Sequence, residues 1–370
     1  MHGATVGERK ATVLPKTGTC LRDTTPDFAH FWDAAHGAPP DVQAAAWAKY
    51  EQRHADLFAA SGGRLGGVDY LSAAMPRYAR DRARMAQIRA QLPALITDAA
   101  DRLGALFGLD ALPVRWVLAV GTYWSDGWVC ELDGQPTVVI ALEMLDSLRH
   151  AHLLVAHEVA HLAHAQAAGP TWDGLVTLAD GLFLEGLAVC ASAHLVPHQT
   201  ASTYLWAGIS ATPTGESLDA WLGRCEAAWP EIRQRVHRDL ERTDQETITT
   251  WFLGDKAGAD MPMRAGYAAG YWLVSRLARD VPIAELARWD SQRINRAIAR
   301  LLAEEERRGH QPPTSHVAVP APAPGPHRAV PSPRTSASQV SPGIHSLAIT
   351  CSLPEIVPDQ CTNLGSRAAL

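Results

Sequence analysis

Most of the chain repeats its apolar residues at the spacing of an α-helix, and this pattern surrounds one short region with a different pattern. In the N-terminal part we predict helices over 41–60, 68–92 and 94–108, where alanine, arginine, leucine and methionine are frequent. A glycine-rich stretch, SGGRLGG at 61–67, separates the first helix from the second, and Pro93 separates the second from the third.

The pattern changes near residue 113, where β-branched and aromatic residues become frequent. We predict three strands from this change, over 114–120, 127–132 and 137–142. The last two flank Asp133–Gly134, a typical turn sequence of a β-hairpin. The region is therefore predicted to form a small antiparallel sheet.

Helical spacing returns after the strands and continues through most of the remaining chain. We predict helices within the ranges 146–168, 181–196, 217–243 and 264–305. There is no internal repeat. The sequence thus predicts a mostly helical protein of the α+β class, with the small sheet directly before the helix at 146–168.

Composition divides the chain into a leader, a body and a tail. Residues 1–24 are predicted to be a flexible leader, and the aromatic segment DFAHFWDAA at 27–35 is expected to pack on the body. Residues 306–370 are rich in proline, serine and alanine, which favours a disordered tail because such a segment buries little apolar surface. The body is one predicted domain, 25–305, with three parts: a helical part at 25–112, the small sheet at 113–142 and a second helical part at 143–305.

The overall composition indicates a folded protein with a large core. The 370 residues are 47% hydrophobic and 19% charged, with a formal net charge of −6. A basic excess is absent, so we expect no nucleic-acid partner. The sequence has no apolar run of 18 residues, and its first 20 residues lack the apolar run of a signal peptide, so we expect no membrane association.

The six cysteines are scattered along the chain and form no CxxC pair. This spacing is typical of a reduced protein and differs from that of a disulfide framework. We therefore predict a cytoplasmic protein. An exported protein would need a signal segment upstream of Met1.

The segment HEVAHLAH at 157–164 introduces polar side chains into an otherwise apolar helix. His157 and His161 are four residues apart, which on an α-helix corresponds to one turn plus about 40° and a rise of about 6 Å. Both imidazoles can therefore reach one tetrahedral zinc ion. Glu158 lies beside them, where a carboxylate can accept a proton from zinc-bound water, which is the chemistry of the HExxH motif.

A catalytic zinc ion usually has three protein ligands, and Glu185 in the segment FLEGLA is the best third candidate. It is the only acidic residue between Asp180 and Glu216, and apolar residues surround it. A buried carboxylate without a partner is costly, and a zinc ion would compensate its charge. Two alternatives stay open: Glu185 forms a salt bridge with an arginine, or the histidines lie on the surface of their helix.

Other histidines compete for the same role. His164 is three residues from His161, but choosing it as the third ligand leaves Glu158 and Glu185 unexplained. His150, His157 and His164 share one helix face, but seven residues span about 10.5 Å, which is too far for one metal ion.

The order of these elements resembles the gluzincin metallopeptidases: a hairpin, then AHEVAHLAH, then FLEGLA on a following helix. More narrowly, it resembles a bacterial family of predicted zinc-dependent proteases that is classed as a domain of unknown function. That family shares an early FW segment, here HFWDAA, and a late GYxxGY element, here at 266–271, preceded by WFLG at 251–254. The likeness covers residues 25 to 305.

The resemblance implies a zincin-like fold in which His157, His161 and Glu185 bind Zn²⁺ and Glu158 is the general base. The chain departs from thermolysin-like gluzincins at Val189, where those enzymes have an aspartate that supports a zinc-binding histidine. The supporting partner must then come from elsewhere or be a backbone carbonyl. The sequence also lacks a match to the aminopeptidase motif that binds a free N-terminus, which argues against exopeptidase activity.

Tyr267 and Tyr271 of the GYxxGY element are four residues apart and share one face of a predicted helix. One interpretation is that both are core tyrosines. The other is that one hydroxyl stabilises the oxyanion that forms when water attacks the scissile carbonyl. Of the two, we prefer Tyr267 for that role.

We therefore predict a zinc-dependent peptidase that hydrolyses a peptide or protein substrate with a metal-activated water. The sheet edge before the zinc-binding helix is expected to hold the substrate by strand addition. Three alternatives are a zincin scaffold that binds a partner without cleaving it, a zinc hydrolase of a non-peptide substrate, and a metal-free helical protein with an accidental HExxH sequence. The intact Glu158 argues against the scaffold, because pure binding does not need that carboxylate.

Overall fold

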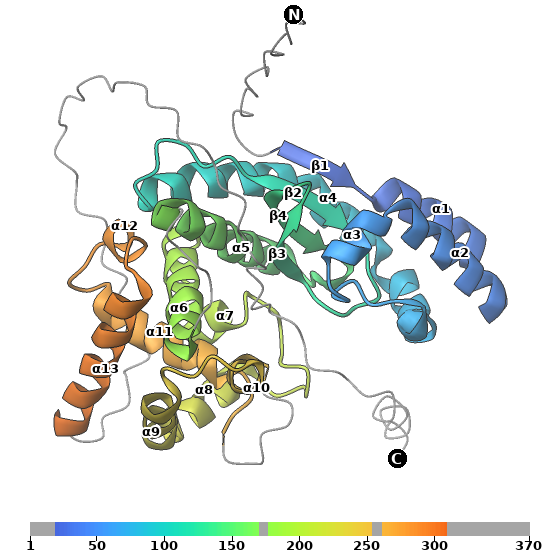
Figure 1. Ribbon diagram of the computed structural model, residues 1–370. Helices are drawn as coiled ribbons and strands as arrows, with labels where there is room; N and C mark the ends of the chain where they lie inside the picture. The colour runs from blue at the N-terminus through green and yellow to red at the C-terminus, as the bar shows by residue number, and fades with distance from the viewer. Residues whose placement is uncertain (1–18, 170–176, 254–260, 309–370) are drawn as a thin grey trace, which may run out of the picture.

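The computed structural model describes residues 19–169, 177–253 and 261–308 (Figure 1). The strands are β1 (Thr19–Asp23), β2 (Arg115–Ala119), β3 (Gly127–Leu132) and β4 (Gln135–Ala141). The helices are α1 (Thr25–Ala35), α2 (Pro40–Arg53), α3 (Ala55–Ala60), α4 (Leu71–Leu106), α5 (Leu148–Ala168), α6 (Leu178–Leu195), α7 (Ala201–Leu205), α8 (Leu218–Ala227), α9 (Trp229–Asp239), α10 (Gln245–Phe252), α11 (Ala265–Leu277), α12 (Ile283–Leu286) and α13 (Ser291–Arg308). The predicted class, mostly α with a small sheet directly before α5, is confirmed.

The two ends of the predicted body differ from the structure by a few residues. Residues 19–23, which the sequence analysis assigns to the leader, form strand β1, and α13 continues to Arg308. The rest of the predicted leader, 1–18, and of the predicted tail, 309–370, lies outside the described residues.

The long helix α4 covers both helices predicted over 68–92 and 94–108, so the predicted break at Pro93 is wrong. Pro93 and Arg89 lie on the exposed face of α4, where water can bind the Arg89 carbonyl that receives no hydrogen bond from proline. Three side chains of the opposite face are buried: Ile88, Leu92 and Ile96. Each burial contributes about 1.5–3 kcal/mol, which together exceeds the cost of about 3 kcal/mol for a proline inside a helix.

The helix predicted over 41–60 is divided into α2 and α3 at His54, where the backbone leaves helical geometry (φ −119°, ψ 31°). The imidazole of His54 is buried, and its Nε2 lies 3.1 Å from Oδ2 of Asp27 on α1. The break therefore coincides with a polar contact that joins α1 to the α2–α3 pair.

The sheet has the strand order β1-β2-β4-β3, and its pairing differs from the antiparallel arrangement that we predicted. β1 and β4 each pair with β2 in parallel, and only the β3–β4 hairpin is antiparallel. The hairpin turn lies at Asp133 and Gly134 as predicted, and both residues have the positive φ that a two-residue turn requires. The sheet is mixed because β1, which the sequence analysis missed, and the crossover from β2 to β4 add parallel pairs.

The two faces of the sheet are covered by different elements (Figure 1). One face packs against α3 and the glycine-rich loop through Leu57 and Leu65, which contact Trp128 and Cys130 of β3. The other face belongs to the main core, together with the apolar sides of α4 and α5. Strand β3 lies at the edge of the sheet and contacts α5 directly.

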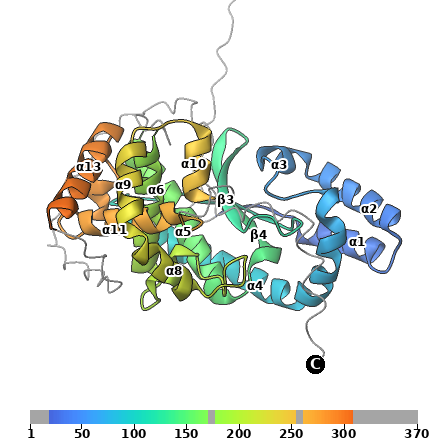
Figure 2. The same ribbon diagram turned by 90° about the horizontal axis from the view of Figure 1, so that it is seen from below.

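The C-terminal helices are organised around α6. A Cβ atom on Gly186 of α6 would collide with the carbonyl oxygen of Gly270 on α11, so the two backbones approach closely because both residues are glycine. α6 is long and apolar enough to cross a membrane, but 94% of it is buried within the protein, as in the core helix of a globular fold. Figure 2 shows α1 and α2 at one end of the molecule and α13 at the other, with the sheet between them.

Candidate metal centre

Helices α5 and α6 carry the residues of the HExxH and FLEGLA segments, and local capping fixes where each helix begins. The hydroxyl of Ser147 accepts a hydrogen bond from the backbone N–H of His150 at the start of α5. Thr177 and Asp180 form a capping box at the start of α6. The two helices pack directly against each other through apolar side chains.

His157, His161 and Glu185 converge between these helices. The Nε2 atom of His157 lies 3.1 Å from Oε2 of Glu185 and 3.1 Å from Nε2 of His161, which in turn lies 3.8 Å from the same carboxylate oxygen. Two ligands of a tetrahedral zinc ion with bonds of about 2.0–2.1 Å lie about 3.4 Å apart. Within the described residues, this is the one group of three or more His, Cys, Asp or Glu side chains spaced to hold a metal ion.

The composition of this group fits a divalent cation. Glu185 is fully buried, its Oε1 has no hydrogen-bond partner among the described atoms, and its ion-pair partners there are the two histidines. Burial lowers the pKa of His161 to about 4, so this imidazole is neutral at pH 7 and has a lone pair for a metal. Two imidazole nitrogens and one carboxylate oxygen are a donor set that zinc accepts.

Glu158 lies beside His157 in α5 but is not a member of this group. Its side chain contacts the start of β3, where a Cβ atom on Gly127 would lie 3.3 Å from its Cγ. Burial raises the pKa of Glu158 to about 8, whereas the positive charges of His157 and, to a smaller extent, Arg64 oppose that rise. A divalent cation on the neighbouring ligands would lower this pKa, because it favours the charged carboxylate.

Residues 134–296 match the model of a family described as predicted Zn-dependent protease (DUF2268). This match supports placing the chain in a zinc protease family. The matched segment begins in the β3–β4 turn and contains α5, α6 and α11, whereas α1 to α4 precede it. No curated protein and no solved structure matches the chain.

The competing histidines of α5 lie outside the group formed by His157, His161 and Glu185. His164 is buried near the ring of Phe183, and burial lowers its pKa to about 3. His150 is buried between two carboxylates, with Nε2 3.4 Å from Asp126 and Nδ1 3.4 Å from Asp146. These positions agree with our preference for Glu185 over His150 and His164 as the third candidate ligand.

The partner expected to support a zinc-binding histidine is absent from the described contacts of His161. Nδ1 of His161 has no hydrogen-bond partner among the described atoms. Val189, which stands where thermolysin-like enzymes have an aspartate, is fully buried and offers no acceptor. In the described part of the chain, the His161 ring is therefore oriented by its packing and by its Nε2 contacts with His157 and Glu185, without an acceptor at Nδ1.

Both tyrosines of the GYxxGY element lie on α11, the helix that crosses α6 next to Glu185. Tyr267 is fully buried, with its ring edge-on to Phe252 and the guanidinium carbon of Arg264 4.0 Å from its centroid. Burial raises the pKa of Tyr271 above its ordinary value. The core interpretation fits both residues, and a catalytic role for Tyr267 stays a prediction.

The sequence analysis missed Arg64, which lies near the centre although it comes from the glycine-rich loop at 61–67. Its charge acts on Glu158 and on Cys130 of β3. A lone arginine in a loop is a weak signal, because the sequence does not show which strand the loop contacts. The distance along the chain between Arg64 and the HExxH segment hides their proximity.

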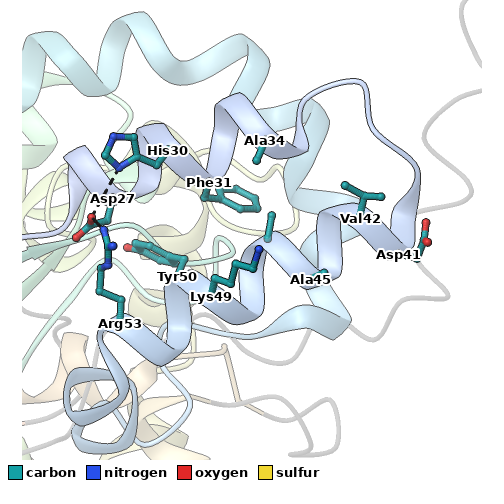
Figure 3. A pocket seen from close by; sticks show the side chains of 11 residues that line it. Asp27, His30, Phe31, Ala34, Asp41, Val42, Ala45, Lys49, Tyr50 and Arg53 are labelled. Atoms are coloured by element: carbon teal, nitrogen blue, oxygen red, sulfur yellow. Dashed lines mark hydrogen bonds and ion pairs between the residues drawn. The ribbon is translucent and has the colours of Figure 1, made fainter.

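A separate groove lies in the other half of the molecule, between α1 and α2 (Figure 3). Its volume is about 510 Å³, and apolar side chains such as Phe31 and Ala45 line it. Asp27 and Arg53 form an ion pair at one end. None of the three candidate ligands lines this groove, so it is distinct from the metal centre.

Proposed function

We propose that this protein is a zinc-dependent peptidase in which His157, His161 and Glu185 bind zinc and Glu158 is the general base. The convergence of two imidazoles and one fully buried carboxylate, without an arginine or lysine counter-charge in the described contacts, carries this proposal. The match of residues 134–296 to a family of predicted Zn-dependent proteases supports it.

The residues around the centre divide the chemistry among them. Zinc, when bound, supplies polarisation of the scissile carbonyl and lowers the pKa of a bound water to about 7. Glu158 adjoins the ligands without being one of them, so its carboxylate can accept a proton from the attacking water and pass it to the leaving amine. We retain Tyr267 as the proposed stabiliser of the oxyanion.

Strand β3 is the element we propose to hold the substrate. The carbonyl of Asp126 accepts a hydrogen bond from the backbone N–H of Ala141, so alternate positions of β3 pair with β4. Val129 falls between those positions and directs its backbone N–H and C=O away from β4. A peptide that adds to this edge as a strand would run beside Gly127 and Glu158.

We further propose that the protein acts on peptides or proteins in the cytoplasm. Three cysteines whose side chains the structure describes, Cys130, Cys190 and Cys225, are buried and free. Free thiols of this kind are usual in a reducing compartment, which supports the location.

The function is tested by incubating the zinc-loaded protein and its Glu158→Gln variant with an unbiased peptide library. We expect the wild type to cleave peptides and the variant to keep its zinc and fold while losing about 100-fold or more in turnover, the usual contribution of a general base. Unchanged turnover would remove Glu158 from the mechanism, and loss of zinc would make it a ligand. A zinc-loaded wild type that binds peptides without cleaving them would favour the scaffold alternative.

A further inference from the structure

We propose that Arg64 binds a carboxylate group of the substrate at the free edge of β3. This inference rests on the proposed peptidase function and gives its substrate an acidic group. Three observations support it: the glycine-rich loop at 61–67 has a defined conformation, the guanidinium of Arg64 has no acidic partner among the described residues, and the loop packs against β3.

The glycine-rich loop at 61–67 has a defined conformation. Gly62, Gly63 and Gly66 have positive φ values of 55°, 86° and 69°, a region that residues with a Cβ rarely adopt. The backbone N–H of Thr122 donates to the carbonyl of Leu65 over 2.9 Å. The loop is therefore held on the connection between β2 and β3.

The guanidinium of Arg64 has no acidic partner within salt-bridge distance among the described residues. Its Nη1 donates to the carbonyl of Ser61 over 3.1 Å, and its buried Nε has no hydrogen-bond partner among the described atoms. By contrast, Arg22, Arg53 and Arg84 each contact an aspartate. A half-buried guanidinium without a counter-charge is a ready binding group for an anion.

The loop places this guanidinium beside the edge strand. Leu65, the next residue, packs with Trp128 and Cys130 on one face of β3, while Gly127 contacts Glu158 on the other. Arg64 precedes Leu65 in the chain, so its side chain starts next to the Trp128 and Cys130 face of β3, and its charge acts on Cys130 there. A substrate strand along β3 would therefore run past Arg64 close to the general base.

A carboxylate fits this position best. The planar guanidinium offers a fork of N–H donors that matches the two oxygens of a carboxylate. A peptide has two sources of this group: an aspartate or glutamate side chain, and the free α-carboxylate at its C-terminus. Both are the same ligand chemistry, and matched peptides separate them.

The binding test uses the zinc-loaded Glu158→Gln protein, so that peptides stay intact, and four fluorescent peptides of otherwise identical sequence. They contain an internal Glu or Gln, and each has a free or an amidated C-terminus. We expect the peptides with the recognised carboxylate to bind about 10- to 100-fold more tightly, as a hydrogen bond to a charged group allows. Adding Arg64→Gln should remove this preference, whereas Arg115→Gln, which deletes a charge near the hairpin turn, should keep it.

Each result assigns or rejects the role of Arg64. A preference that follows the internal Glu assigns an acidic side chain, and one that follows the free C-terminus assigns the α-carboxylate. Equal binding of all four peptides, or a preference that survives Arg64→Gln, overturns the proposal. If Arg64→Gln does not fold, Arg64→Lys replaces it in the test. Lysine keeps the charge and loses the forked N–H donors of the guanidinium, so the preference should fall several-fold. An undiminished preference in Arg64→Lys also overturns the proposal. Failure of the peptidase function is a different result, namely a zinc-loaded wild type that cleaves no peptide.

Discussion

Buried carboxylates are compensated in different ways among the N-terminal helices and between α5 and α6. On α4, Oδ1 of Asp81 lies 2.8 Å from Nε of Arg80 and 3.0 Å from Nη1 of Arg84. Between α5 and α6, Glu185 has two histidines as its ion-pair partners in the described part of the chain. The partners of the first cluster are arginines with a permanent positive charge, and those of the second are histidines, which are charged only when protonated.

The pKa values of the two clusters express the same difference. Although burial opposes it, hydrogen bonds from Arg80 and Arg84 lower the pKa of Asp81 to about 2, so the carboxylate is charged and paired. Burial lowers the pKa of His161 to about 4, so this imidazole cannot supply a positive charge to Glu185 at pH 7. The Asp81 cluster thus contains its counter-charge in two arginines, whereas the α5–α6 cluster has the spacing to hold a cation from solution.

Removing zinc should produce the largest change in stability. A ligand bound only by the native state stabilises it by about 4 kcal/mol when its free concentration is 1,000 times its Kd. We expect a chelator to lower the urea midpoint of the wild type and to have no effect on a His157→Ala, His161→Ala double variant. Equal midpoints for the wild type with zinc and with chelator would mean that the cluster needs no cation.

Glu143 provides an intermediate case, a buried carboxylate whose described hydrogen bonds come from backbone N–H groups. Tyr123 N donates to Oε1 over 3.4 Å, while Oε2 has no partner among the described atoms. Burial raises the pKa of Glu143 from 4.5 to about 7. The native state then holds a proton that the unfolded chain has released, so stability should fall as the pH rises from about 4.5 to about 7 and stay lower above that.

Glu143→Gln should remove this pH dependence, because the amide keeps an acceptor oxygen and cannot ionise. At pH 8 we expect the variant to be more stable by about 3 kcal/mol. The measurement is urea unfolding between pH 4.5 and 8 in the His157→Ala, His161→Ala background, where zinc binding does not contribute. Parallel stability curves for the two proteins would show that Glu143 is already ionised in the native state at low pH.

Asp81→Asn should have the smallest effect and should leave the metal centre unchanged. The variant loses the carboxylate charge that strengthens three hydrogen bonds from Arg80 and Arg84, worth about 1–3 kcal/mol at neutral pH. Because the pKa of Asp81 is depressed, the wild type should lose the same stability as the pH falls from 3.8 through about 2. Urea unfolding gives the loss and metal analysis gives the zinc content; a fall in zinc content would contradict the separation of the two clusters.

The parts of the fold that local spacing determines could be predicted from the sequence. α5 and α6 were predicted because their apolar positions repeat over several turns, and the spacing of His157 and His161 follows from helix geometry. β1 was missed because its parallel partner β2 follows four intervening helices, so only the tertiary pairing stabilises it. The continuity of α4 through Pro93 likewise depends on burial against other elements.

The candidate metal centre also has parts that local sequence predicts and parts that only tertiary packing determines. Glu185 was predicted as a ligand because a lone acidic residue in an apolar helix needs a counter-charge, and the structure brings it to the two histidines. Arg64 was missed because its position depends on how a glycine-rich loop contacts Thr122. Packing between distant segments decides that contact, and helical or strand periodicity carries no information about it.

X-ray absorption at the zinc edge, combined with metal analysis of the purified protein, tests most directly whether the three side chains between α5 and α6 bind one zinc ion. We expect about one zinc per chain, with two imidazole nitrogens at about 2.0–2.1 Å, carboxylate oxygen at about 2.0–2.2 Å and no sulfur. The His157→Ala, His161→Ala double variant should lose the zinc. Sulfur ligands in the wild type, or one zinc per chain retained in the double variant, would contradict a centre built from His157, His161 and Glu185.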